Sequence, residues 1–255
     1  MKKIEERQEE IRNILSINEH IRVEELAARL HVTGATIRSD LREMEKRQEI
    51  SRSRGGVSLV RPQIVDLKVK EKIFINAEQK MKIAMAAVQL IKNRDSIMMM
   101  SGTTMEAMAR QIGTSVELNV VTPSIPIAFT LAAKENVEIL VLGGKLTHTS
   151  LSVRDEYTIQ GLNNVFCTKL FTSCDGLDFG TGVVTATNEE ARLTSTMMKS
   201  AAKTILLADS SKFGKTGFGR ISRLEDIDTI ITDDGIAESY RNRLEDMGIE
   251  VIIAQ

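Results

Sequence analysis

The chain has 255 residues, of which 42% are hydrophobic and 27% charged, with a formal net charge of −1. These proportions are typical of a folded globular protein, and the balanced charge excludes a chain whose whole surface binds polyanions. The positive charge is local, because residues 1–61 carry 13 Lys and Arg against 11 Asp and Glu, whereas the remainder is net acidic.

The composition also indicates a compartment. The run Met1–Arg7 is charged with no apolar segment behind it, and no stretch is long enough to cross a bilayer. Cys167 and Cys174 fit a reducing compartment and are expected to be small buried residues. The three histidines form no paired metal-binding motif. We therefore expect a cytoplasmic protein with no metal, no cofactor and no membrane partner.

Three helices are predicted at the start of the chain. Ile4–Ile17 reads as the first, with Ile4 among the residues turned inward. Two short amphipathic helices follow between Ile21 and Leu41, with apolar stripes at Val23, Leu26, Ala27 and Leu30, and at Ile37, Leu41 and Met44. Thr33 suits the N-cap of the last helix, because its hydroxyl can accept a free backbone amide. Such a pair is the sequence form of a helix-turn-helix.

The polar face of the last helix carries Thr36, Arg38, Ser39 and Arg42, which are residue types that reach base edges and phosphates in a major groove. An ordinary helical hairpin with a solvated face is the alternative. The next residues favour DNA binding, because Glu49–Ser53 and Val57–Val60 read as two strands of a wing around Arg54 and two glycines. Residues 46–61 carry five basic side chains, Arg52 and Arg54 among them, and one acid, as phosphate contacts require.

These residues carry a family resemblance. The run Val23–Ala27, then Val32-Thr33, Thr36–Leu41 and Arg54–Gly56 resembles the N-terminal domain of DeoR-family bacterial transcriptional regulators. The resemblance implies a winged helix-turn-helix over residues 1–61, with Thr33, Thr36, Arg38, Ser39, Arg42, Arg52 and Arg54 at double-stranded operator DNA. Ser39 departs from the family, which usually has an arginine there, and this bears on operator preference.

Residues 62–75 read as a connecting segment, and the pattern then changes to helices alternating with short apolar runs over 76–255. The predicted strands are Ser96–Met100, Leu118–Thr122, Val137–Leu142, Lys169–Cys174, Thr204–Ala208, Thr229–Thr232 and Glu250–Ile253. The predicted helices are Glu78–Ile91, Thr104–Gln111, Ile125–Asn136, Asn188–Ala201 and Ile236–Met247. This alternation predicts an α/β fold with a mainly parallel sheet covered on both faces.

Polar loops follow several of these strands, where open α/β sheets bind ligands. Ser101, Gly102, Thr103 and Thr104 form either a phosphate cradle at a helix N-terminus or a routine strand-to-helix turn. Thr187 and Glu190 fit a helix cap and capping box, which is a structural role. Lys212 can meet a phosphate as a point charge or stay solvated in its loop.

Together these loops extend the resemblance across the chain. Ser101–Thr104, Leu142–Gly144, Asp175-Gly176, Asn188–Glu190, Asp209–Gly214 and Ile231–Asp233 occur in the order of the DeoR-family sensor domain. That domain is similar in fold to sugar-phosphate isomerases, and is taken to bind a phosphorylated sugar without turning it over. The resemblance implies an effector site formed by Ser101, Gly102, Thr103, Thr104, Asp175, Gly176, Asn188, Glu189 and Lys212.

Some positions depart from that family pattern. Met100 stands where the family usually has an aspartate, Pro123 where it has an asparagine, and Thr194 where a lysine is common. Ser173 and Cys174 replace a usual Gly-Ala. Either the effector differs from that of other family members, or the pocket binds its ligand less tightly.

Three hypotheses follow. The first is a sequence-specific DNA-binding regulator, a repressor of carbohydrate-metabolism genes controlled by a phosphorylated sugar-like effector, with no catalytic activity. The second is a regulator whose sensor domain binds no ligand. The third is an isomerase-type enzyme, which would need a carboxylate base such as Asp175, Glu189 or Glu190. For the first we expect a homo-oligomer, because a single winged helix reads only a short half-site.

Overall fold

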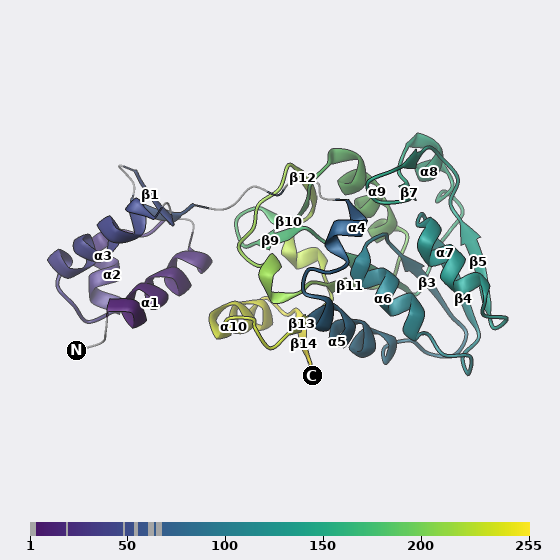
Figure 1. Cartoon of the computed structure of the whole chain (residues 1–255), viewed down its shortest axis with the longest axis horizontal. Helices are drawn as coiled ribbons and strands as arrows, with labels where there is room; N and C mark the ends of the chain where they lie inside the picture. The colour runs from purple at the N-terminus through teal and green to yellow at the C-terminus, as the bar shows by residue number, and fades with distance from the viewer. Residues whose placement is uncertain (1–3, 19, 48, 54–55, 61–63, 65–67) are drawn as a thin grey trace.

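A computed structural model of the chain describes residues 4–18, 20–47, 49–53, 56–60, 64 and 68–255. It has a small helical part at the N-terminus and a larger α/β part (Figure 1). Arg54 and Gly55, which the sequence places at the tip of the wing, lie outside the described residues. No described helix combines the length and the apolar surface that crossing a membrane requires.

The N-terminal part contains α1 (Ile4–Ile17), α2 (Val23–Arg29) and α3 (Gly34–Lys46). Thr33 is the N-cap of α3, as predicted, because its side chain accepts the Thr36 amide. Between the two helices His31 adopts a positive φ of 54°, which turns the chain sharply. The core is built from these helices and the wing: Ile11, Leu15, Ile21, Leu26, Ile37, Leu41, Met44, Ile50 and Val57. The prediction that Ile4 points inward is wrong, since it lies in the first turn of α1 and is 59% exposed.

The wing consists of β1 (Ile50–Ser53) paired antiparallel with β2 (Gly56–Leu59). Ile21 joins it, since Ile21 and Val57 exchange both backbone hydrogen bonds. Gly56 is needed at this junction, because its φ is +145° and a Cβ would stand 2.6 Å from the Ile21 carbonyl oxygen. The α1–α2 connection is thereby fixed to the wing.

The larger part is built on a seven-stranded sheet with the order β14-β13-β11-β8-β3-β4-β5. Every pairing in it is parallel. The strands are β3 (Asp95–Met99), β4 (Leu118–Thr122), β5 (Val137–Val141), β8 (Lys169–Ser173), β11 (Thr204–Leu207), β13 (Thr229–Asp233) and β14 (Glu250–Ala254). The predicted parallel α/β sheet is confirmed.

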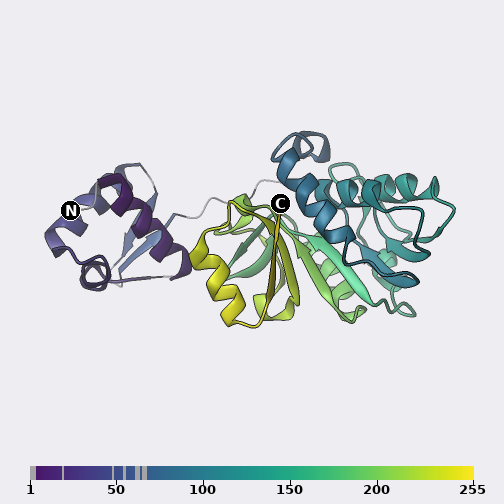
Figure 2. The ribbon, with the colours of Figure 1, turned by 90° about the horizontal axis from the view of Figure 1, so that it is seen from below.

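Alternation along the strands divides the core into two layers, because successive side chains of a strand point to opposite faces. On β3, Ile97 and Met99 pack with α5 (Ala77–Val88), α6 (Thr103–Gln111) and α7 (Ile125–Ala132). Met98 packs instead toward α9 (Asn188–Lys199), and α10 (Glu238–Asp246) packs beside it on β13 and β14. The two layers are visible on either side of the sheet (Figure 2).

Several short elements were not predicted. They are α4 (Val69–Lys72), β6 (Leu146–Thr147), β7 (Ser152–Val153), α8 (Glu156–Gln160), β9 (Gly176–Asp178), β10 (Gly182–Thr185), β12 (Gly219–Ser222) and the 3-10 turns η1 (Ser210–Lys212) and η2 (Leu224–Asp226). Strands β12, β10 and β9 form a small antiparallel sheet beyond the end of β8. The connecting segment therefore contains a helix, α4, that the charged and weakly patterned sequence did not indicate.

The two parts of the chain meet where α1 ends. The Tyr240 hydroxyl on α10 donates to the Ser16 carbonyl over 3.0 Å, and Arg243 donates to the Ile17 carbonyl. These carbonyls belong to the last turn of α1, where no intrahelical donor remains. Figure 2 shows α10, in yellow, beside the purple α1.

Candidate DNA-binding surface and effector pocket

Helix α3 presents a polar face away from its core. Ile37, Asp40, Leu41 and Met44 are its buried residues. Arg38, Ser39 and Arg42 are exposed on the opposite side. The Arg38 guanidinium is only loosely held, 3.5 Å from a carboxylate oxygen of Glu24, and more than half of it is exposed. The face is thus basic and available for contacts to a nucleic acid.

The wing is tied to this helix through a third arginine. Arg52 on β1 donates to the Arg38 carbonyl over 3.2 Å and pairs with Glu45 at 3.3 Å. At the start of the helix, the hydroxyls of Thr33 and Thr36 are hydrogen-bonded to each other over 2.9 Å. The structure thus brings together six of the seven residues predicted at DNA, and the seventh, Arg54, lies outside the described residues.

A buried ion pair fixes α3 against α1. Arg7 is 5% exposed and Asp40 is 3% exposed. The guanidinium makes two hydrogen bonds to the carboxylate, of which the one from Nη2 to Oδ1 is 2.8 Å long. Asp40 strengthens proton binding by this hydrogen bond and raises the pKa of Arg7 against the opposing effect of burial. Such bidentate geometry sets the orientation of the helix as well as its stability.

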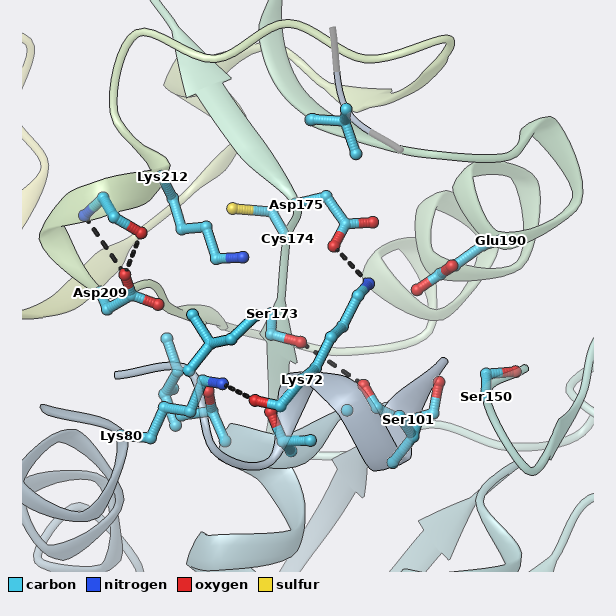
Figure 3. A pocket seen from close by; sticks show the side chains of 18 of the residues that line it. Lys72, Lys80, Ser101, Ser150, Ser173, Cys174, Asp175, Glu190, Asp209 and Lys212 are labelled. Atoms are coloured by element: carbon cyan, nitrogen blue, oxygen red, sulfur yellow. Dashed lines mark hydrogen bonds and ion pairs between the residues drawn. The ribbon is translucent and has the colours of Figure 1, made fainter. Parts of the chain in front are cut away.

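A cavity of about 270 Å³ lies at the carboxyl ends of β3, β8 and β11, three neighbouring strands of the large sheet. This is where the topology of an open α/β sheet leaves room for a ligand. Its walls come from the loops after these strands, from α5, α9 and the β6–β7 loop, and from the segment around α4. Figure 3 shows the side chains that converge on it.

One wall is the start of α6. Ser101, Gly102, Thr103 and Thr104 all line the cavity, as the sequence predicted they would share one site. Gly102 adopts a φ of +131°, and a Cβ there would stand 2.9 Å from the Ser173 hydroxyl. The hydroxyls of Thr103 and Thr104 make no hydrogen bond to any other described residue. Free hydroxyls beside the first amides of a helix form a suitable site for an anion.

Four lysines line the cavity: Lys72, Lys80, Lys212 and Lys215. Within the described part of the chain, the ammonium groups of Lys212 and Lys215 have no hydrogen-bond or ion-pair partner. Lys212 lies across the cavity from Ser101 in Figure 3. The Lys80 ammonium donates to the Lys72 carbonyl over 2.6 Å and is otherwise enclosed.

Burial lowers the pKa of Lys80 to about 8. Asp209 opposes this shift, while Lys212 and Lys72 add to it. Burial likewise lowers the pKa of Lys215, helped by the charge of Lys212. The lysines therefore repel one another across the empty space, and an anion between them would relieve that repulsion.

Three carboxylates share the site. Burial would raise the pKa of Asp175, but Lys72, Lys212 and the Thr185 hydroxyl outweigh it, so that the pKa lies below its usual value. Burial raises the pKa of Glu190, and the charge of Asp175 adds to the shift. Glu190 pairs with Arg154 at 3.0 Å. The predicted capping box is therefore wrong in one half: Thr187 caps α9, but the Glu190 carboxylate serves Arg154 instead.

The third carboxylate positions the loop of Lys212. Asp209 accepts the Ser211 amide at 3.2 Å and the Asn76 side-chain amide at 2.8 Å. Asp233, at the end of β13, accepts both the amide and the hydroxyl of Ser210 at 2.7 Å. Asp209 and Asp233, which belong to two separate polar motifs of the sequence, thus hold the loop of Lys212 at the cavity.

The structure does not gather every predicted residue here. Asp175 and Lys212 line the cavity, but Gly176, Asn188 and Glu189 are not among its described lining residues. Gly176 packs closely under the Lys215 backbone. Cys174 does line it, and burial raises the pKa of its thiol to about 12. Both cysteines are buried, as predicted.

Met100 and Thr194, two of the residues that depart from the family pattern, are buried beside the cavity and are not among its described lining residues. Met100 is 2% exposed and packs with Leu193 and Met197 of α9. The Thr194 hydroxyl donates to the Glu190 carbonyl over 2.9 Å. The sequence reasoning missed Lys72, Lys80, Thr149 and Ser150, which do line the cavity. Only their polarity distinguishes them in the sequence.

Two domain families match this arrangement. The DeoR-like helix-turn-helix domain matches residues 7–63, and the DeoR C terminal sensor domain matches residues 75–234. The chain is 35% identical over 248 residues to the uncharacterized HTH-type transcriptional regulator YulB of Bacillus subtilis strain 168, covering 97% of this chain and 96% of that protein. It is 33% identical to the lactose phosphotransferase system repressor of Streptococcus mutans, covering 90% and 92%.

The winged helix and the sensor sheet together define a two-domain DNA-binding transcriptional regulator. The chain belongs to the DeoR family of such regulators, as its sequence indicated. A structure of ribose 5-phosphate isomerase A from Methanocaldococcus jannaschii overlaps 54% of each chain with 17% identity and a TM-score of 0.38.

Proposed function

We propose that the protein is a repressor of carbohydrate-metabolism genes that leaves its operator when a phosphorylated sugar binds the cavity. The observation that carries this proposal is that one cavity is lined by Lys212, whose ammonium has no partner among the described residues, and by the free hydroxyls of Thr103 and Thr104. A phosphate there would receive charge from one side and hydrogen bonds from the other. The name of the Streptococcus mutans relative, a lactose phosphotransferase system repressor, points to the same class of genes.

The rest of the cavity suits a polar ligand body. Thr149 and Ser150 supply hydroxyls, and Asp175 and Glu190 supply carboxylate oxygens that can accept from sugar hydroxyls. Met100 contributes nothing polar, so the sugar contacts have to differ from those of family members with a carboxylate there. We infer that the compound is bound without being turned over, and that the protein acts on DNA in the cytoplasm.

Calorimetric titration with a panel of sugar phosphates tests the proposal. Wild type is expected to bind at least one, and Lys212→Ala should weaken that binding by tenfold or more. Lys203→Ala is the matched control, because Lys203 is exposed just before β11, whereas Lys212 follows the same strand at its other end. No heat with any sugar phosphate would refute the effector proposal and favour a sensor that binds no ligand. Product formation from the bound compound would favour the alternative hypothesis of an isomerase-type enzyme.

At the DNA, we propose that Arg38 and Ser39 reach base edges while Arg42, Arg52 and Arg54 contact phosphates. A single α3 reads a short half-site, so operator affinity needs a second copy. Strand β5 is an edge of the large sheet, and apolar side chains on β5, α7, β6 and α8 are exposed: Leu140 by 48%, Phe129 by 82%, Leu146 by 42% and Tyr157 by 76%. We infer a homo-oligomer that covers this surface.

A further inference from the structure

The connecting segment forms part of the cavity it leads to. We define residues 68–76, which include α4, as the strap. Val69, Lys72 and Ile75 of the strap line the cavity, opposite the loops that follow β8 and β11. In Figure 3 the Lys72 side chain points into the cavity toward Asp175.

The strap is held to the sensor domain by a few polar contacts. The Val69 amide donates to the Thr149 carbonyl over 2.8 Å, and Asn76 reaches Asp209 at 2.8 Å. Between these ends, the Lys72 ammonium pairs with Asp175 at 2.8 Å, and the Lys72 carbonyl accepts from Lys80. Three of these four partners, Asp175, Asp209 and Lys80, are charged side chains in the cavity wall, so the strap rests on the groups that a ligand would contact.

We propose that Lys72 is a binding residue of the effector pocket, exchanging Asp175 for the phosphate of the ligand and so transmitting occupancy through the strap to the DNA-binding domain. This inference rests on the proposed function. It adds a residue on the N-terminal side of the sensor domain, and it identifies the part of the chain that moves.

Geometry and charge favour the exchange. Lys72 is about one quarter exposed and Asp175 about one eighth, so their ion pair faces the open cavity and is not sealed in the core. A phosphate carries up to two charges and three acceptor oxygens, which makes it a stronger partner for an ammonium than one carboxylate oxygen. Asp175 keeps other partners after the exchange, because Thr185 and the Ala186 amide donate to its second oxygen at 3.0 and 3.2 Å.

A covalent path connects the strap to the DNA-binding domain, so that the exchange at Lys72 can affect DNA binding. Strand β2 of the wing ends at Leu59, and residues 60–67 join it to the strap. Within that link, the Ile64 amide donates to the Thr216 carbonyl over 3.2 Å, and Ile64 also lines the cavity. A displacement of Lys72 therefore acts on a segment that continues along the chain into the wing. A ligand can shift an equilibrium only through such contacts that differ between states.

The test compares Lys72→Ala with Lys70→Ala in the full-length protein. Lys70 is the control, since it lies on the same short helix but is exposed. Inorganic phosphate and the sugar-phosphate panel are titrated by calorimetry. Affinity for a DNA site recovered by in vitro selection is then measured with and without the best ligand. Hydrogen exchange of residues 68–76 reports the strap itself.

We expect Lys72→Ala to bind the ligand at least tenfold more weakly and to lose the ligand response of its DNA affinity, while Lys70→Ala behaves as wild type. Ligand should also change exchange in the strap of wild type and not in Lys72→Ala. Lys72→Arg should recover part of the binding, because it restores the cation. Unchanged ligand affinity in Lys72→Ala, with Lys212→Ala impaired, would overturn this inference and leave the proposed function standing. No binding by wild type would overturn both.

Discussion

The ion pair between Arg7 and Asp40 makes a sharp prediction about the DNA-binding domain. Both side chains are almost fully buried, and they join α1 to α3, the helix whose opposite face carries Arg38 and Arg42. Replacing Asp40 with alanine would leave the guanidinium buried without this carboxylate. Breaking a buried pair from one side costs about 3–5 kcal/mol.

That cost is large for a domain of this size. At the usual 0.05–0.15 kcal/mol per residue, the roughly 57 residues matched to the helix-turn-helix family hold about 3–9 kcal/mol of total stability. We therefore expect Asp40→Ala to open α1 and α3 much more often and to bind DNA poorly. The sensor domain, which has separate cores, should stay folded.

Hydrogen exchange in the full-length chain measures this directly. A loss of 3–5 kcal/mol corresponds to roughly 10²–10⁴-fold faster exchange of core amides in α3. Glu43→Ala is the matched control, because Glu43 is exposed on the same helix. The double variant Arg7→Met with Asp40→Leu should recover most of the protection, since an apolar pair can replace a buried ion pair at little cost. If Asp40→Ala exchanges like wild type, the pair does not hold the domain together. If the double variant is as unstable as the single one, the loss does not come from a guanidinium left buried without this carboxylate.

Three other predictions concern DNA, protons and assembly. Arg38→Ala should cost about 1–3 kcal/mol of DNA affinity if it reads a base, and Arg42→Ala should weaken all sequences alike and flatten the salt dependence; wild-type gel shifts from both would contradict the assignment. The pKa of Lys80 is lowered to about 8, so that at pH 8.5 much of this lysine is deprotonated. A bound phosphate should raise that pKa, and calorimetric heats should then reveal proton uptake that Lys80→Met reduces; undiminished uptake by the variant would exclude this lysine. Leu140→Asp should reduce the oligomer seen by light scattering, and a monomeric wild type at micromolar concentration would refute the oligomer itself.

Regular elements were predictable because their signals are local. The first helix, Ile4–Ile17, and the strand Leu118–Thr122 have the bounds that the sequence predicted, since each has a clear period and a polar boundary. The small sheet of β9, β10 and β12 was missed, because its strands have three or four residues and begin with glycine. Such short runs acquire strand geometry from their partners and not from their own propensity.

The cavity was predictable only where one loop supplies it. Residues 101–104 are contiguous and run from the end of β3 into the first turn of α6, so their common location follows from the fold class. Lys72 and Asp175 are 103 positions apart, and Arg154 and Glu190 are 36 apart, so that no local pattern connects them. For Glu190 the local rule of the capping box gave the wrong partner, because a buried guanidinium competes for the same carboxylate.

In the part of the chain that the structure describes, two links join the sensor to the DNA-binding domain, and one substitution separates their roles. The contact at α10 approaches the cavity through ring packing: Phe213, which follows Lys212, lies edge-on to Tyr240 with ring centroids 5.3 Å apart. The strap, in contrast, places a charged group inside the cavity. Tyr240→Phe keeps the rings and removes the hydroxyl that reaches the Ser16 carbonyl. We expect it to loosen the end of α1 in hydrogen exchange while the ligand still lowers DNA affinity. If Tyr240→Phe abolishes the response and Lys72→Ala does not, the signal passes through α10 and the strap only covers the pocket.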